Sequence, residues 1–144
     1  MTDITPFTYQ ALAENLSWDL SNPEVPYVDG GTIDVSLFTQ AQHFPNGYIP
    51  SGTVLGKVTA SGKLGPYLDA ATDGRQTAVG ILRASVQAVQ PVTGALKTTV
   101  GVAVLKAWGV VSVAKLPLTS SNAAAGGYLD ANGQADLPHI HFAA

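Results

Sequence analysis

The sequence predicts an all-β fold, a small β-barrel or β-sandwich with an extended N-terminal arm and little helix. Glycine and proline together make up 24 of the 144 residues (15 Gly and 9 Pro), and both interrupt long helices. Val and Thr recur in short apolar runs bounded by Gly/Pro turns, which is typical of strands joined by tight turns. The length suits one domain with a modest core.

Residues 1–32 form the predicted arm and residues 33–144 the predicted domain. A helix over 8–15 would be too short to be stable alone, and Pro23, Pro26 and the glycines at 30–31 break any regular element after it. The arm nevertheless carries several large apolar side chains: Phe7, Tyr9, Leu12, Leu16, Trp18, Leu20 and Tyr27. Without periodicity they cannot form a core of their own. We therefore expect the arm to lie on its own domain, a sister subunit or another protein.

Within the domain, strands are expected wherever β-branched and apolar residues run between turns. The predicted strands cover 33–38, 53–59, 63–67, 77–86, 96–113 and 140–142. In the long stretch 96–113, Gly109 is expected to bend the chain into two strands. Its first half is apolar on both faces, with Gly101 and Ala103 on the smaller one, which predicts a central strand that is approached closely on that face. Residues 120–127 are expected to form a loop or a short helix.

Charge and composition argue against several classes of partner. The formal net charge is −3, and the seven Lys and Arg residues are scattered singly, with none in the first 56 residues. A nucleic-acid-binding stripe is therefore not expected. The chain has no cysteine, which excludes disulfides and thiolate metal sites. The N-terminus lacks the features of a signal peptide, and the longest apolar run, 100–105, is too short to span a membrane, so we expect a soluble protein used without secretion.

One pattern near the C-terminus has the spacing of metal ligands. His139 and His141 would point to the same side of a strand and could chelate one ion. With Gly133 before them they resemble the first half of a cupin metal motif. The second half needs a carboxylate and a histidine downstream, but the chain ends three residues after His141, and His43 lies far upstream. We therefore expect an edge strand with two polar positions, no metal and no cofactor.

The remaining motif candidates do not support an enzyme. The Ser-Gly-Lys at 61–63 differs from a phosphate-binding loop because Ser61 stands where glycine is required and Leu64 where Ser or Thr must hold magnesium. Asp69 and Asp73 lack the further acidic residues of a calcium site, and the Thr-Asp-Gly at 72–74 is typical of a turn. No Gly-x-Ser-x-Gly nucleophile elbow occurs. We expect no catalytic residues.

The stretch 47–85 resembles the head decoration proteins of tailed bacteriophages, the lambda-like capsid-stabilising family. The resemblance rests on IPSGTVLGK at 49–57, GPY at 65–67 and above all ATDGRQTAVGIL at 71–82. TIDVSLF at 32–38 and YLDANGQADLPHIHF at 128–142 are similar to actinobacteriophage members, so the resemblance covers about residues 15–142. Residues 118–144 differ from the shortest lambda-like members, and their role, core or trimer seam, stays open.

The resemblance implies a structural protein that performs no chemistry. It implies a homotrimer on the outer surface of the virion capsid, at three-fold and quasi-three-fold positions, assembled in the host cytoplasm. Such trimers bind the expanded shell and reinforce it against the pressure of packaged DNA. The major capsid protein is the implied partner, bound through the arm and first strand, and nucleic acid and membrane are not. The corresponding candidate binding residues are Phe7, Tyr9, Leu12, Leu16, Trp18, Ile33 and Val35.

Two other classes of function stay open. A β-module that binds carbohydrate or a receptor on the virion surface would use aromatic residues such as Trp18 and Trp108 as a concave platform. A cupin-like metalloprotein would carry bound metal at the histidine pair. Isolated tryptophans are more often core or interface anchors, which favours the decoration protein.

Overall fold

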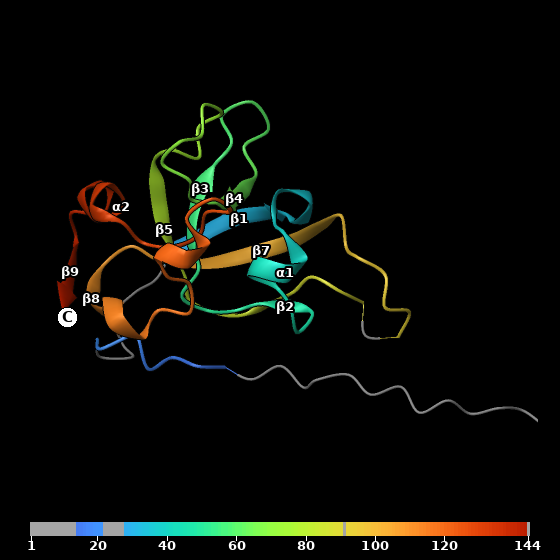
Figure 1. The fold of residues 1–144 in the computed structure, drawn as a ribbon, viewed down its shortest axis with the longest axis horizontal. Coiled ribbons are helices and arrows are strands. Elements are labelled where there is room, and N and C mark those ends of the chain that lie inside the picture. The colour runs from blue at the N-terminus through green and yellow to red at the C-terminus, as the bar shows by residue number, and fades with distance from the viewer. Residues whose placement is uncertain (1–13, 22–27, 91, 144) are drawn as a thin grey trace, which may run out of the picture.

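The computed structural model describes residues 14–21, 28–90 and 92–143, without the side chains of 28–30 and 102–104 (Figure 1). Strands and turns dominate this part of the chain, which confirms the predicted all-β class. The strands are β1 (Val28–Asp34), β2 (Tyr48–Ile49), β3 (Val54–Lys57), β4 (Leu64–Pro66), β5 (Ala78–Leu82), β6 (Val86–Gln87), β7 (Thr99–Lys106), β8 (Gly109–Ser112) and β9 (Ile140–Ala143). The short helices are α1 (Gln40–His43), α2 (Ala131–Asp136) and the 3-10 turns Val35–Leu37, Val113–Lys115 and Ser120–Asn122.

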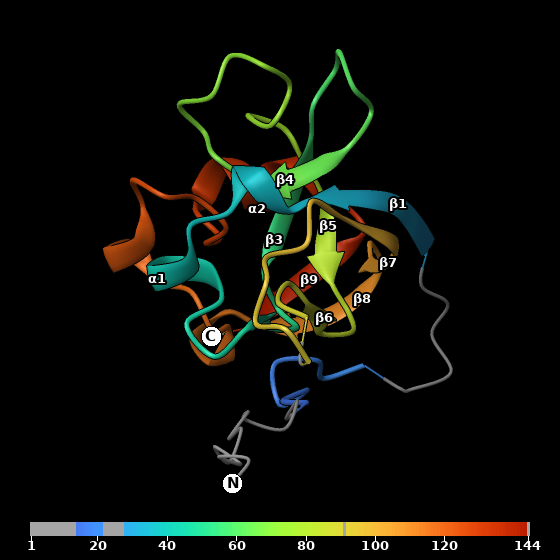
Figure 2. The ribbon, with the colours of Figure 1, turned by 90° about the vertical axis from the view of Figure 1, so that its right-hand side faces the viewer.

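Five strands close into a barrel in the order β1-β4-β3-β5-β7 (Figure 2). The long strand β7 pairs antiparallel with both β1 and β5, as expected for a central strand. A parallel contact between Ile33 of β1 and Leu64 of β4 completes the ring. Two small sheets lie outside it, an antiparallel β2–β6 pair and a parallel β8–β9 pair. Closure leaves the barrel strands without free edges, which a small β-domain needs in order to avoid edge-to-edge association.

The wall formed by β3 and β5 separates two hydrophobic cores. Leu55 and Leu82 point into the barrel interior, whereas their neighbours Val54 and Ile81 point outward into a second cluster. Successive side chains of a strand face opposite sides, so a strand with cores on both sides must be apolar throughout. This explains why β3 is buried everywhere except at Lys57.

The C-terminal segment covers the outer face of this wall. Leu129, Leu137 and Ile140 are buried in the second core. Side chains of the segment accept hydrogen bonds from the barrel: the hydroxyl of Tyr67 donates to Asp130 Oδ1 at 2.9 Å, and Ala78 N donates to Asp136 Oδ2 at 2.9 Å. Residues 118–143 therefore contribute to the core of the chain itself, while a further part in a trimer seam stays a prediction.

Most of the predicted strands are present with shorter bounds, and the bend at Gly109 is confirmed. Gly109 has φ +116°, a conformation that favours glycine, and it separates β7 from β8. The strand predicted over 33–38 is wrong after Asp34, because the Asp34 carboxylate accepts a hydrogen bond from Ser36 N and starts a 3-10 turn. Within the chain itself nothing approaches Gly101 closely, since an added Cβ would meet nothing within 4 Å.

The boundary between arm and domain differs from the predicted residue 32. Strand β1 begins at Val28, already paired with Leu105 of β7, so residues 28–32 belong to the barrel. Residues 14–21 also lie against the domain, as shown below. Most of the helical stretch considered over 8–15 lies outside the described residues. No helix in the described part of the chain is long and apolar enough to cross a membrane.

Candidate functional site

The candidate site is the place where residues 14–21, here called the N-terminal strap, attach to the domain. Its backbone runs antiparallel to β8 and extends the β8–β9 sheet. Leu20 N donates to Val110 O at 3.0 Å, and Ser112 N donates to Trp18 O at 2.7 Å. Strand addition of this kind holds a segment through main-chain hydrogen bonds, while pockets for its side chains select the sequence.

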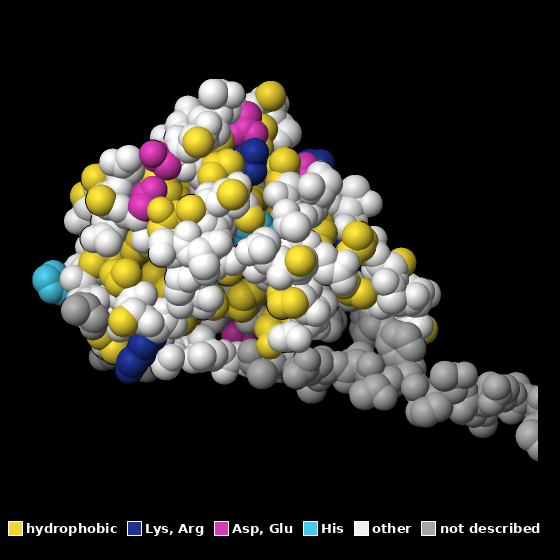
Figure 3. All heavy atoms as spheres, viewed as in Figure 1, with side chains coloured by type: hydrophobic (Ala, Val, Ile, Leu, Met, Phe, Trp, Pro, Cys, Tyr) yellow, Lys and Arg dark blue, Asp and Glu magenta, His cyan; other side chains and the backbone are white. Residues whose placement is uncertain are grey.

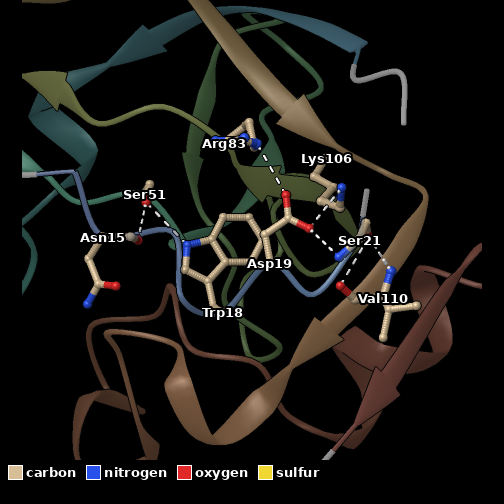
Figure 4. Close-up of polar contacts among 8 residues, drawn as sticks. All are labelled: Asn15, Trp18, Asp19, Ser21, Ser51, Arg83, Lys106 and Val110. Atoms are coloured by element: carbon tan, nitrogen blue, oxygen red, sulfur yellow. Dashed lines mark hydrogen bonds and ion pairs between the residues drawn. The ribbon is translucent and has the colours of Figure 1, made fainter. Parts of the chain in front are cut away.

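The first such pocket holds Trp18, whose side chain is completely buried. Its indole Nε1 donates to Ser51 Oγ at 3.2 Å, and Ser51 Oγ in turn donates to Asn15 O at 2.8 Å (Figure 4). Gly52 allows the ring to fit, because a Cβ there would come within 2.6 Å of Pro117 and 3.1 Å of the indole nitrogen. The tryptophan thus has both a shaped apolar cavity and a partner for its polar atom.

The second pocket holds the carboxylate of Asp19 between two cations. One oxygen lies 3.1 Å from Lys106 Nζ and the other 3.2 Å from Arg83 Nε (Figure 4). The Lys106 side chain is 3% exposed and that of Asp19 is 7% exposed. A lysine buried this deeply in a barrel strand needs a counter-charge, because an uncompensated buried ion is strongly destabilising. The strap supplies that counter-charge.

Both ends of the strap are fixed by further hydrogen bonds. At its start, the Glu14 carboxylate accepts from Ser85 N at 2.7 Å and from Ser85 Oγ at 3.1 Å. At its end, Ser21 Oγ accepts from Val110 N at 2.6 Å and donates to Val110 O at 3.2 Å. The strap is therefore attached along its whole length.

The predicted capsid-binding residues fall into three groups. Trp18, Ile33 and Val35 are buried in the chain's own cores, so their side chains are covered in this conformation. Leu16 packs partly buried against the second core. Phe7, Tyr9 and Leu12 lie outside the described residues. The structure thus divides a set that the sequence treated as one surface, because the domain itself provides apolar partners for Leu16 and Trp18.

The sequence does not show that Arg83 and Lys106 lie together around Asp19. Arg83, Lys106 and Asp19 come from β-strand ends and the strap, far apart in the chain. One signal was present: Lys106 ends the most apolar run of the sequence, and a lysine on such a strand calls for a carboxylate partner. Which of the acidic residues would supply it depends on the tertiary fold.

The histidine pair lies at the other edge of the β8–β9 sheet. His141 is exposed on β9, and the ring of His139 packs edge-on against Trp108 at 6.3 Å. His43 is buried elsewhere, with Nε2 3.0 Å from Gly126 O. Among the described residues, no group of three or more His, Cys, Asp or Glu side chains could hold a metal ion. The structural role of the pair remains a prediction.

Comparison with known families identifies the family to which the chain belongs. A family model described as bacteriophage lambda head decoration protein D matches residues 32–125, about two thirds of the chain. The chain belongs to this head decoration protein family. It is therefore a structural protein of the phage head, located on the virion capsid that it binds, in a family that is not enzymatic. A search of curated proteins found no match.

The region that matches the decoration protein family does not include everything that holds this fold together. It runs from the last residues of β1 to just after the 3-10 turn Ser120–Asn122, and leaves out the strap and residues 126–143. Those two segments supply Trp18, Leu129, Leu137 and Ile140 to the second core. This decoration protein thus closes its outer core with segments on either side of the family region.

Proposed function

We propose that this decoration protein binds the outer surface of the expanded phage capsid as a homotrimer, at three-fold and quasi-three-fold positions. There it stabilises the head against the pressure of packaged DNA. The partner is the major capsid protein, and the role needs no cofactor, metal, nucleic acid or membrane. The family match over residues 32–125 is the observation that carries this proposal.

The strap contacts support different roles for residues 1–13 and residues 14–21. Because Glu14 and Asp19 attach residues 14–21 to the domain, Glu14, which follows residues 1–13 in the chain, is held at a fixed point beside Ser85. Those residues contain Phe7, Tyr9 and Leu12 and no Lys or Arg. We assign capsid binding to residues 1–13. The other candidate residues act indirectly, by packing the strap and the start of the barrel into the cores of the domain. They are Leu16, Trp18, Ile33 and Val35.

The described surface is consistent with a protein that functions while covered by others. Charged side chains are sparse over the face in Figure 3, and apolar side chains are spread among uncharged polar ones. The large apolar residues that are exposed in the described part of the chain are Leu20, Val92, Leu96 and Trp108. These four side chains are available for contact with neighbouring molecules.

The test is a titration of purified protein onto emptied, expanded heads. A variant lacking residues 1–13 is expected to keep its thermal unfolding midpoint but to lose at least about thirtyfold in affinity, equivalent to about 2 kcal/mol of interface energy. The triple variant Phe7→Ala, Tyr9→Ala, Leu12→Ala should reproduce the loss, while its control, Thr2→Ala, Thr5→Ala, Thr8→Ala, should not. Equal binding by the truncated and full chains would refute the role of residues 1–13.

A further inference from the structure

We propose that Asn46 is a site of spontaneous covalent modification, in which the main-chain nitrogen of Gly47 attacks the asparagine side chain and converts it to aspartate and isoaspartate. The sequence contains two Asn-Gly pairs, at 46–47 and 132–133. Glycine has no Cβ, so it leaves the attacking nitrogen unhindered. The structure leaves the first pair open to this reaction and protects the second. The inference is independent of capsid binding.

The reaction needs only the chain and water. The Gly47 nitrogen forms a bond to Asn46 Cγ, and its proton leaves with the side-chain amide group as ammonia. The product is a five-membered succinimide ring, which water opens at either of its two carbonyl carbons. One opening gives aspartate, and the other gives isoaspartate, in which the main chain runs through the former side chain. The net change is the replacement of an amide NH2 by OH, and no group is oxidised or reduced.

The reactive pair lies in an exposed turn between α1 and β2. Pro45 and Asn46 are both exposed, and the Asn46 side chain makes no hydrogen bond within the described part of the chain. Gly47 has φ +86°, and its nitrogen donates across the turn to Phe44 O at 3.0 Å. A single hydrogen bond between neutral groups in an exposed turn opens readily. The nitrogen is therefore released to the neighbouring side chain without unfolding the domain.

The surroundings of Gly47 leave room for the attack. Its carbonyl oxygen accepts from Ala88 N at 3.0 Å and from Val89 N at 3.1 Å, just after β6. These bonds hold the far side of the residue, whereas the attack needs rotation on the near side, where the exposed residues 45–46 are free to move. An added Cβ at Gly47 would meet only Val89, at 3.7 Å, which is an ordinary contact.

The second Asn-Gly pair is protected by the helix α2 in which it lies. Gly133 N donates to Asp130 Oδ1 at 2.7 Å, and a hydrogen bond to a carboxylate is stronger than one to a neutral carbonyl. Gly133 is buried, and an added Cβ would come within 3.1 Å of Tyr67 and 3.2 Å of Leu129. Release of this nitrogen would unwind the helix and disturb the second core. We therefore expect Asn132 to react slowly in the folded protein.

Modification changes the turn that leads into β2. Either product adds a negative charge at the surface, and isoaspartate also adds one carbon atom to the main chain before Gly47. Phe44 and Ile49, on the two sides of the turn, are 1% and 0% exposed, so both ends of the turn are fixed in the first core. The added length must be absorbed between them. We expect isoaspartate to loosen this turn.

The test follows both asparagines in the same molecule. The full-length protein is incubated at about pH 8.5 and about 37 °C, digested and mapped by mass spectrometry, in which deamidation adds one dalton. A methyltransferase specific for isoaspartyl residues identifies the product that forms only through the succinimide. Asn46 is expected to deamidate at least tenfold faster than Asn132. In urea, which removes the protection by α2, the two rates should agree within about threefold.

Two matched variants assign the reaction to its site. Asn46→Gln has a longer side chain, whose cyclisation is far slower, and should abolish the acidic form that accumulates on ion exchange. Asn132→Gln should leave that form unchanged. Equal rates at the two asparagines in the folded protein would overturn the proposal, and so would a tenfold difference that persists in urea. Deamidation of Asn46 without isoaspartate would exclude attack by Gly47.

The effect on the turn is measured on the modified fraction, isolated by ion exchange. Its thermal unfolding midpoint should lie below that of Asn46→Asp, which carries the same charge on a main chain of normal length. Equal midpoints would contradict the expected loosening of the turn.

Discussion

At the scale of single residues, Asp19 takes part in two of the three ion pairs in the described structure. Asp19→Asn removes the charge between Lys106 and Arg83 and leaves Lys106 buried without a counter-ion. The expected loss is about 3–5 kcal/mol in the free energy of unfolding, measured by urea denaturation. Asp69→Asn, at an exposed position, is the control and should stay within about 0.5 kcal/mol of the parent.

A second change distinguishes charge from packing at the same place. Combining Asp19→Asn with Lys106→Met removes both buried charges and should recover much of the lost stability, because apolar replacements of a buried ion pair are often neutral. If the double variant is as unstable as Asp19→Asn alone, the carboxylate acts through Arg83 or through Ser21 N, which also donates to Asp19.

Trp18 is the residue on which the second core depends most. Trp18→Ala is expected to cost about 3–5 kcal/mol of stability, since the ring is fully buried and its removal leaves a cavity. Trp18→Phe keeps most of the packing but leaves Ser51 without its indole donor, so a smaller loss of about 1 kcal/mol is expected. Urea denaturation monitored by circular dichroism measures both. Equal losses for the two variants would show that the hydrogen bond outweighs the packing.

His43 makes the stability depend on pH. Burial lowers the pKa of this imidazole below its usual value of 6.5, although the hydrogen bond to the Gly126 carbonyl acts in the opposite direction. Thr39 N donates to Nδ1 at 2.8 Å, so the neutral ring bears its proton on Nε2, which donates to Gly126 O. The unfolded state therefore binds the proton more readily than the folded state. This contribution to stability is present above about pH 6.5 and is lost as the pH falls toward the lower folded pKa.

The measurement is the urea midpoint between pH 7.5 and pH 5.5, which is expected to fall with pH in the parent. His43→Gln should flatten this dependence, at a cost in stability at pH 7.5. The double variant His139→Ala, His141→Ala is the control: both side chains are exposed, so it should keep the slope and lose no more than about 1 kcal/mol. An unchanged slope in His43→Gln would assign the pH dependence to other groups.

At the scale of elements, the strap behaves as part of the domain rather than as a free arm. Deleting residues 1–13 is expected to leave the unfolding midpoint unchanged. Deleting residues 1–21 removes Trp18 and Asp19 and opens the edge of β8, so a loss of several kcal/mol is expected. Thermal unfolding of the two truncated proteins makes this comparison. A stable protein without residues 1–21 would show that the strap contacts contribute little.

At the scale of the whole molecule, association is the property to measure. Sedimentation across the micromolar range is expected to show a trimer, as the proposed function requires. A monomer in solution and on heads would contradict the trimer while leaving membership of the decoration family unaffected.

The all-β class, most strands and the family could be predicted from the sequence because they depend on local signals. Glycine at position 109 is a local signal for a bend, since the φ of +116° found there suits few other residues. The run ATDGRQTAVGIL identifies the family through consecutive residues. Likewise Ile140 and Phe142 predict a last strand from their spacing alone, and β9 is present.

The arm, by contrast, was predictable only as a segment in need of a partner. Trp18 and Leu16 are apolar residues without periodicity, and nothing local tells whether their partner is the chain's own domain or another protein. The tertiary structure decides this, because it brings Ser51, Lys106 and Arg83 together beside β8 from distant parts of the chain. Burial and charge pairing depend on the positions of distant residues in space. The sequence therefore determined the class of fold and the family, whereas the tertiary structure decided that residues 14–21 pack on the chain's own domain.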